Sequence, residues 1–286
     1  MRLRIGTRAS ALAMAQATRV QRELLAIGVD SEIVPVSTQG DVDKVRPLSE
    51  IGGKGVFIKG VEEALLDGRA DIAVHSFKDV TSELAPGLVL AGALTAESNS
   101  DVLVLRDGLE GFPEDGVVLT GSMRREVFLK ELYPKVTTRP IRGNLETRLK
   151  TLDQSDAHAV MVSEVGLLRL GIERRTIAMD SEVFLPAPGQ GVIALECRES
   201  DAEIVAVLEK LSDVTTLTQM RCEFAILGMI GFDCRIPFGL LTRVLGDSFQ
   251  LKMGIGDAEG NVVRAELETG DLQVVASRIS SLKALL

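Results

Sequence analysis

The feature that most constrains the fold is a repeated alternation of short apolar runs with segments of helical periodicity. Residues 3–5, Leu-Arg-Ile, predict a first strand, and residues 11–26 follow with apolar side chains at helical spacing. The same order recurs with the run 33–36, the helical segment 56–66 and the run 72–74. A βαβαβ order predicts a parallel sheet covered by helices, and hence an α/β fold.

The second half of the chain repeats this alternation without an alignable sequence repeat. Short apolar runs at 101–105, 117–119 and 159–162 predict strands, with helical segments between them. After residue 240 the pattern changes to alternating strands, separated by turns and closed by a helix, which predicts a small α+β domain. Polar residues 95–100 and the Pro/Gly-rich stretch 185–191 are candidate crossings between domains.

Composition excludes several function classes. The 286 residues are 45% hydrophobic, which is enough for more than one domain, and the net charge of −9 does not favour duplex DNA or anionic membranes as partners. No apolar run reaches the roughly 20 residues of a membrane span, and the N-terminus lacks a signal-peptide pattern, so we expect a cytoplasmic protein. Three cysteines and two histidines without ligand spacing predict neither a disulfide framework nor a metal site.

The run 72–74 leads into a dense group of polar side chains. His75, Ser76, Lys78 and Asp79 lie within five residues at the expected carboxyl end of a strand. Ligands of open α/β sheets bind at that edge. A carboxylate beside an ammonium group there can hold a ligand or handle protons, although a solvated turn is an alternative interpretation.

Other predicted strand ends carry basic or hydroxyl groups. Arginine binds carboxylates bidentately through charge-assisted hydrogen bonds of about 1.5–3 kcal/mol each. Any one of these residues could be a surface charge, but their repeated placement predicts a ligand with several carboxylates. Asp79 would then stabilise a cation or orient an N–H group, unless it only pairs with a neighbouring arginine. The basic and hydroxyl positions are Arg8, Ser10, Lys54, Lys78, Thr120, Ser122, Arg124, Arg125, Arg142 and Arg148.

The three cysteines differ in their surroundings. Cys197 and Cys222 lie in apolar segments and are expected to pack in the core. Cys234 lies in an irregular loop with Gly, Asp and Pro, where a thiol is more available for chemistry.

Taken together, these residues resemble the porphobilinogen deaminase family from about residue 4 to residue 239. The tail after residue 239 matches more weakly. The motifs are long and specific: GTRASALA at 6–13, GGKGVF at 52–57, RADIAVHSFKD at 69–79, RGN at 142–144 with TRL at 147–149, LPAPGQG at 185–191, and Cys234 with Pro237 and Gly239.

The resemblance implies a monomer with three domains. Two βα domains resemble type II periplasmic binding proteins around a cleft, and a small α+β C-terminal domain carries a cysteine on a loop. The implied boundaries are 1–98 with 192–212 for the first domain, 99–191 for the second and 213–286 for the third. The implied cofactor is a dipyrromethane bound through a thioether to Cys234.

The resemblance also implies the reaction and the residue roles. Four porphobilinogen molecules are joined head to tail onto the cofactor with loss of ammonia, and hydroxymethylbilane is then released by hydrolysis. Asp79 matches the catalytic aspartate. Matching cofactor-binding positions are Lys54, Phe57, Lys78, Thr120, Ser122, Arg124, Arg125 and Arg148, and matching substrate-binding positions are Arg8, Ser10, Gln16, Arg142, Arg148 and Arg169.

Some positions depart from the family pattern. Leu119 and Gly121 replace Gly and Ser in the usual motif, Gln39 replaces a common Arg, and Phe232-Asp233 replaces Gly-Gly before the cysteine. Two alternatives therefore stand beside the enzyme: a divergent homologue that binds the cofactor or tetrapyrrole precursors with little turnover, and a two-domain anion-binding protein.

Overall fold

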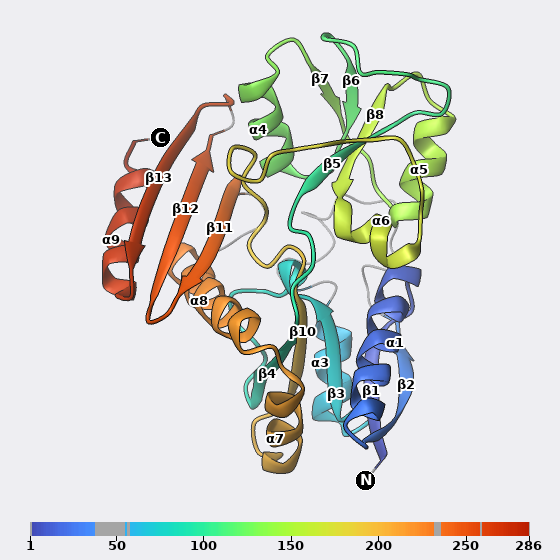
Figure 1. The fold of residues 1–286 in the computed structure, drawn as a ribbon, viewed down its shortest axis with the longest axis vertical. Helices are drawn as coiled ribbons and strands as arrows, with labels where there is room; N and C mark the ends of the chain where they lie inside the picture. The colour runs from blue at the N-terminus through green and yellow to red at the C-terminus, as the bar shows by residue number, and fades with distance from the viewer. Residues whose placement is uncertain (1, 38–54, 56–57, 232–235, 258, 286) are drawn as a thin grey trace. The chain divides into compact units, whose positions relative to one another are not determined.

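The computed structural model describes residues 2–37, 55, 58–231, 236–257 and 259–285 (Figure 1). The chain forms two compact units. Met1–Glu97 with Gly191–Gly228 makes the first unit, and Ser98–Gln190 with Met229–Leu286 makes the second. The predicted three-domain boundaries stay a prediction.

The first unit is built on a five-stranded mixed sheet in the order β2-β1-β3-β10-β4. β1 pairs in parallel with β2 and β3, whereas β10 is antiparallel to both β3 and β4. Its strands are β1 (Arg2–Arg8), β2 (Asp30–Val36), β3 (Ile72–Ser76), β4 (Leu88–Leu94) and β10 (Ile193–Arg198), and its helices are α1 (Ala11–Ala26), α3 (Lys59–Leu66) and α7 (Ala202–Leu211).

Both faces of this sheet are covered by helices. Along β3, Ile72 and Val74 belong to an apolar cluster with residues of α1 and α7. Ala73, between them, belongs to a second cluster with residues of α3. This alternation follows from the two-residue period of a strand and explains why the run 72–74 is apolar throughout.

The second unit contains a sheet with the same topology. Its order is β7-β6-β8-β5-β9, with β6 parallel to β7 and β8, and β5 antiparallel to β8 and β9. Its strands are β5 (Asp101–Leu105), β6 (Val117–Leu119), β7 (Thr137–Arg139), β8 (Ala159–Ser163) and β9 (Thr176–Ala178), and its helices are α4 (Met123–Leu132), α5 (Leu145–Asp153) and α6 (Glu164–Leu170).

The remaining residues form the predicted small α+β element after the long helix α8 (Val214–Ile230). β11 (Phe238–Leu245), β12 (Ser248–Gly256) and β13 (Val262–Thr269) make an antiparallel sheet, and α9 (Leu272–Lys283) lies against β13 (Figure 1). Gly239 is required at its position, because a Cβ atom there would lie 2.6 Å from the Phe128 ring. The predicted fold class, α/β with a small α+β part, is confirmed.

Two local expectations differ from the structure. β3 continues through His75 and Ser76, and a short 3-10 helix, η1 (Phe77–Asp79), replaces the expected loop.

No helix in the described part of the chain combines the length and the apolar character that a membrane crossing requires.

Candidate active site

A small cavity of about 50 Å³ lies at the carboxyl ends of β1 and β3. These strands are parallel neighbours, so their ends meet at one edge of the sheet, as expected for a ligand site. The cavity is lined by Arg8, Ser10, Leu12, Ala13, Gln16, Ile58, Val74, His75, Ser76 and Asp79. Arg8, Ser10, Gln16 and Asp79 are thus gathered in one place.

The polar residues of this cavity are held by specific contacts. Ser10 caps α1, where its Oγ accepts the Ala13 N–H at 3.4 Å. Gln16 is buried and donates from Nε2 to Ser76 Oγ at 2.8 Å, which ties α1 to the end of β3. Phe77 is fully buried and packs against Phe224 with ring centroids 6.5 Å apart, and this packing fixes the position of η1.

Asp79 is the exposed member of this group. Among the described residues, its carboxylate has no hydrogen-bond or ion-pair partner. Lys78, the preceding residue, is half-buried, as is Arg8 across the cavity. The salt bridge considered as the alternative role of Asp79 is therefore absent from the described residues, and the carboxylate is available to a ligand.

A buried imidazole–carboxylate pair lies beneath the cavity. His75 Nε2 is 2.8 Å from Glu196 Oε2, and the two side chains are 5% and 1% exposed. The pairing of β3 with β10 sets Ala194 opposite His75 and Ala73 opposite Glu196, so the two side chains are diagonal neighbours on one face of the sheet. Sequence reasoning missed Glu196, because it lies in an apolar strand 121 residues from its partner.

In the second unit, Arg124 and Arg125 are buried around the carboxylate of Asp101. Arg124 Nη2 lies 2.7 Å from Asp101 Oδ2, and Arg125 Nη2 lies 2.7 Å from Oδ1. Gln190 Nε2 donates to Oδ1 at 3.0 Å. Arg125 Nε also donates to Asp101 Oδ1, at 3.0 Å. Each guanidinium group makes one further bond to a backbone carbonyl, from Arg124 to Leu185 and from Arg125 to Met161.

Asp101 therefore supplies part of the counter-charge that the sequence had suggested a ligand would provide. Burial favours the neutral carboxyl, but the charges of Arg124 and Arg125 outweigh it and hold the pKa of Asp101 far below its usual range. Burial in turn lowers the pKa of the Arg124 guanidinium, partly offset by Asp101. Nothing in the sequence distinguished Asp101 from the first residue of an apolar strand.

The other site residues predicted in the second unit lie at strand ends and helix starts. Ser122 caps α4, where its Oγ accepts the Arg125 N–H at 3.4 Å, and Thr120 Oγ1 accepts the Ser122 N–H at 3.2 Å. Arg148 on α5 donates from Nε to the Gly143 carbonyl at 2.9 Å. Arg142 Nη1 is buried and has no hydrogen-bond partner among the described residues. Arg169 lies in the last turn of α6.

Three predicted site residues, Lys54, Phe57 and Cys234, lie outside the described residues. The two other cysteines are buried, as expected for packing. Burial raises the pKa of the Cys197 thiol to about 11 and that of Cys222 to about 12, which keeps both in the unreactive thiol form.

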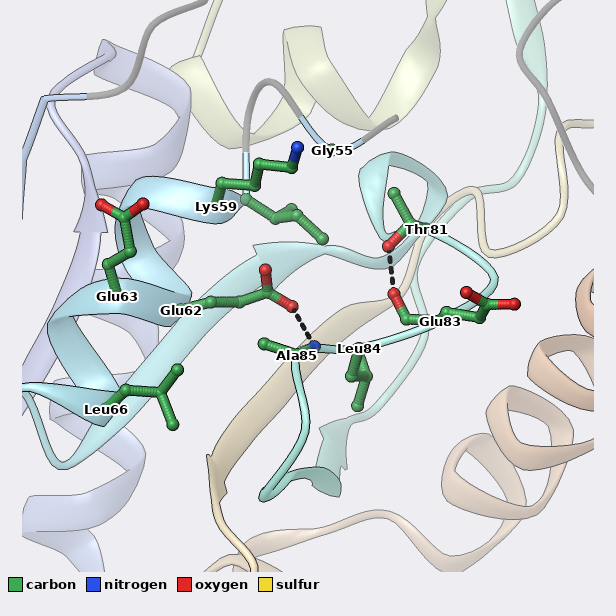
Figure 2. Close-up of a pocket in the computed structure, with 10 residues that line it drawn as sticks. Gly55, Lys59, Glu62, Glu63, Leu66, Thr81, Glu83, Leu84 and Ala85 are labelled. Carbon is green, nitrogen blue, oxygen red and sulfur yellow. Dashed lines mark hydrogen bonds between the residues drawn. The ribbon is translucent and has the colours of Figure 1, made fainter. Parts of the chain in front are cut away.

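A larger cavity of about 390 Å³ lies beside α3, and Figure 2 shows its lining. It contains none of the predicted site residues. Glu62 points into it from α3, and its Oε1 accepts the Ala85 N–H at 3.0 Å. Burial raises the pKa of Glu62; the negative charge of Glu196 also raises it, and the Ala85 N–H partly offsets the shift.

Known proteins resemble the chain over most of its length. Among solved structures, it is similar to the methionine-binding protein MetQ, with 13% identity, a TM-score of 0.45 and coverage of 78% of this chain and 94% of that chain. The periplasmic VFT2 domain of Bordetella pertussis BvgS is similar at 16% identity, with a TM-score of 0.43 and coverage of 78% and 92%.

Sequence relatives are closer. The probable porphobilinogen deaminase of Hyperthermus butylicus is 37% identical over 91% of this chain and 88% of its own length. The porphobilinogen deaminases of Burkholderia thailandensis and Sorangium cellulosum are 40% and 41% identical, over 92% of this chain and over 82% and 89% of their own lengths. Residues 3–206 match the family model described as porphobilinogen deaminase, dipyromethane cofactor binding domain. The chain therefore belongs to the porphobilinogen deaminase family.

Proposed function

We propose that the chain is a porphobilinogen deaminase, which joins four porphobilinogen molecules head to tail, releases ammonia at each addition and finally releases hydroxymethylbilane by hydrolysis. The family membership supports this activity. The observation that carries it in the structure is the exposed Asp79 carboxylate at a cavity lined by Arg8, Ser10 and Gln16. A free carboxylate beside cationic and hydroxyl groups fits a substrate that has both carboxylates and a nitrogen that becomes cationic.

Asp79 is the proposed catalytic residue. Loss of ammonia from the aminomethyl group of porphobilinogen leaves a cationic azafulvene, in which the charge is shared with the pyrrole nitrogen. The Asp79 carboxylate would accept a hydrogen bond from pyrrole N–H groups and stabilise that charge. Its lack of a protein cation among the described residues supports this role, since a salt bridge would already have neutralised it.

Substrate carboxylates are the proposed ligands of the basic groups. Each porphobilinogen carries an acetate and a propionate, and a guanidinium binds a carboxylate through two parallel hydrogen bonds. The buried Nη1 of Arg142, which has no partner in the described part of the chain, supports this role, because an unsatisfied buried donor is costly unless a ligand accepts from it. The proposed substrate-binding residues are Arg8, Ser10, Gln16, Arg142, Arg148 and Arg169.

The donor groups of the chain also fit the dipyrromethane cofactor of the family, a molecule that carries carboxylates as well. When bound, this group supplies the pyrrole carbon to which the first substrate is joined. Cys234 would hold it through a thioether, and the further residues proposed to hold it are Lys54, Phe57, Lys78, Thr120, Ser122, Arg124, Arg125 and Arg148. Asp101 orients two of these, Arg124 and Arg125, through the bonds described above.

We further propose that the protein acts as a cytoplasmic monomer on its small-molecule substrate, without nucleic acid or membrane partners. The net charge of −9 and the scarcity of aromatic side chains, 3% of the residues, support this. Three domains at 1–98 with 192–212, 99–191 and 213–286 remain our proposal for the organisation of the chain.

Two measurements test the proposed function. The intact mass of the denatured protein, followed by peptide mapping, should show two linked pyrrole units on Cys234. Asp79→Ala should abolish formation of hydroxymethylbilane while the circular dichroism spectrum stays unchanged. Turnover close to that of the wild type in this variant would refute the role of Asp79, and an unmodified Cys234 together with no product would favour a binding protein instead.

A further inference from the structure

The roles proposed above do not include the buried pair of His75 and Glu196. Both side chains are almost completely removed from solvent, and burying ionisable groups is unfavourable unless they are paired and fully hydrogen-bonded. Glu196 Oε1 has no hydrogen-bond partner among the described residues, so the bond to His75 is the only one that its side chain makes there. An apolar pair at these positions would serve packing without that cost.

His75 is also in contact with the candidate active site. His75 lines the same cavity as Asp79, Ser76 and Arg8, although only 6% of its surface is exposed. The cavity volume of about 50 Å³ has room for one water molecule, which occupies about 30 Å³ in the liquid. One water is enough to carry a proton between a bound ligand and a side chain that it does not touch directly.

The hydrogen bond to Glu196 fixes what the imidazole can do. When Nε2 carries its proton and donates it to Glu196, a neutral ring keeps its free lone pair on Nδ1. An ionised Glu196 then stabilises the positive charge that appears if Nδ1 takes up a proton. Within the described residues no second donor bonds to Glu196, so its negative charge is not already compensated by another group and can stabilise the imidazolium.

We propose that the His75–Glu196 pair accepts the proton that is released when each new carbon–carbon bond forms. This inference rests on the proposed function, in which Asp79 stabilises the cation as a hydrogen-bond acceptor. When the free α-carbon of a porphobilinogen-derived ring attacks the azafulvene methylene, the new C–C bond forms and the α-carbon still carries its hydrogen. Its C–H bond then breaks, the electron pair restores the aromatic ring, and the proton moves to Nδ1 of His75.

The atoms, charges and electrons of this step balance without any further reactant. The aminomethyl group enters as an ammonium and leaves as ammonia with the electron pair of its C–N bond. The proton on His75 passes to ammonia or to water, which returns the imidazole to its neutral form. One ammonium ion is therefore the net product of each addition, and no oxidant, reductant or metal is needed.

Charged groups surround the imidazole on several sides. Arg8 lies across the cavity on β1, Asp79 lies on η1, Glu196 lies on β10, and Glu62 on α3 interacts electrostatically with both His75 and Glu196.

The test compares His75→Gln with the wild type, using porphobilinogen that carries deuterium on its free α-carbon. Gln retains an N–H for Glu196 but has no nitrogen that accepts a proton. We expect kcat per cofactor-loaded enzyme to fall by about 10²–10⁴-fold with little change in KM. We also expect a primary deuterium isotope effect on kcat that the wild type lacks, because proton removal then limits the rate. An unchanged kcat, or a lower kcat without an isotope effect, would overturn the proposal.

His158 offers the matched control, since it is the only other histidine of the chain. His158 Nδ1 accepts the Val117 N–H at 2.9 Å, and His158→Asn keeps an acceptor there. This variant should retain the wild-type kcat, and a loss equal to that of His75→Gln would overturn the proposal. If Asp79→Ala keeps turnover, the proposed function has failed, whereas normal turnover of His75→Gln beside an inactive Asp79→Ala rejects the proton-accepting role alone.

A second measurement does not depend on activity or on the folding of a variant. With two histidines, the ¹⁵N spectrum of the wild-type imidazoles can be assigned by comparison with His158→Asn. We expect His75 to be the tautomer with the proton on Nε2 at a pH where the enzyme turns over. A ring protonated on both nitrogens throughout the active pH range could accept no proton, and that result would overturn the proposal.

Discussion

Replacing Asp101 by Asn should destabilise the second unit more strongly than any change of a surface charge. The side chain keeps its size, but the negative charge that two buried guanidinium groups share is lost. Arg124 and Arg125 are 5% and 7% exposed, so water cannot replace the missing carboxylate. One of the two oxygens of the carboxylate becomes an amide NH₂, which cannot accept from either arginine.

The magnitude follows from the four hydrogen bonds that end on this carboxylate: one from Arg124, two from Arg125 and one from Gln190. Removing one partner of a buried ion pair costs about 3–5 kcal/mol, because the remaining charge stays buried without compensation. With two arginines left, we expect a loss at the upper end of that range. Whole domains have unfolding free energies of about 5–15 kcal/mol, so much of the stability of this unit would be lost.

The assay is urea unfolding followed by circular dichroism, with Glu114→Gln as the control. Glu114 pairs with Lys135 at 2.7 Å, but the two side chains are 78% and 65% exposed. Such exposed pairs contribute about 0–1 kcal/mol, so this control should unfold at nearly the wild-type urea concentration. If Asp101→Asn lost no more than the control, the Asp101 carboxylate would not be the counter-charge of the two arginines, and the reasoning would be refuted.

Three further predictions concern buried groups whose pKa values are shifted. Because the folded-state pKa of Asp101 is depressed, its stabilisation is complete above about pH 4 and is lost as the pH falls further; the difference in Tm between wild type and Asp101→Asn should therefore shrink on acidification, as measured by calorimetry. Burial raises the pKa of Glu62, so the wild type loses stability as the pH rises above the usual carboxyl pKa of 4.5. The difference in Tm between Glu62→Gln and wild type should therefore grow in favour of the variant above that pH, and an unchanged difference would contradict this. Cys197 and Cys222 should resist iodoacetamide in the native protein, because both are buried with raised pKa values; mass mapping of the alkylated peptides checks this.

Much of the fold was predictable because it depends on local periodicity. The helix expected over 11–26 agrees with α1 (Ala11–Ala26), where apolar spacing and the Ser10 cap point to the same boundaries. β9 was missed because all three of its residues, Thr176–Ala178, are exposed and form no apolar run. β11 (Phe238–Leu245) was missed as well, since it begins directly after an irregular loop and contains Gly239, which made its first residues look like part of that loop.

The site was predictable only where sequence neighbours and parallel strand ends determine it. Arg8, Ser10 and Asp79 gather at one cavity because β1 and β3 are adjacent and parallel, a relation that a βαβ order implies. Asp101 and Glu196 were not predictable, because each is a charged residue in a mostly apolar strand. Their partners lie 23 or more residues away, so only the register of the sheets and the packing of α4 reveal them.

The two five-stranded sheets suggest a reason to place the proposed catalytic carboxylate on the first one. In the shared topology, β3 of the first unit corresponds to β8 of the second, and each ends in a serine followed within three residues by a carboxylate. After β8 that carboxylate is Glu164, whose Oε2 accepts the Ser98 hydroxyl at 2.5 Å at the start of α6. After β3 the chain enters η1 instead of a longer helix, and Asp79 reaches solvent without a partner among the described residues. One topology thus offers a carboxylate at two equivalent strand ends, and the local turn leaves only that of Asp79 available to a cationic ligand.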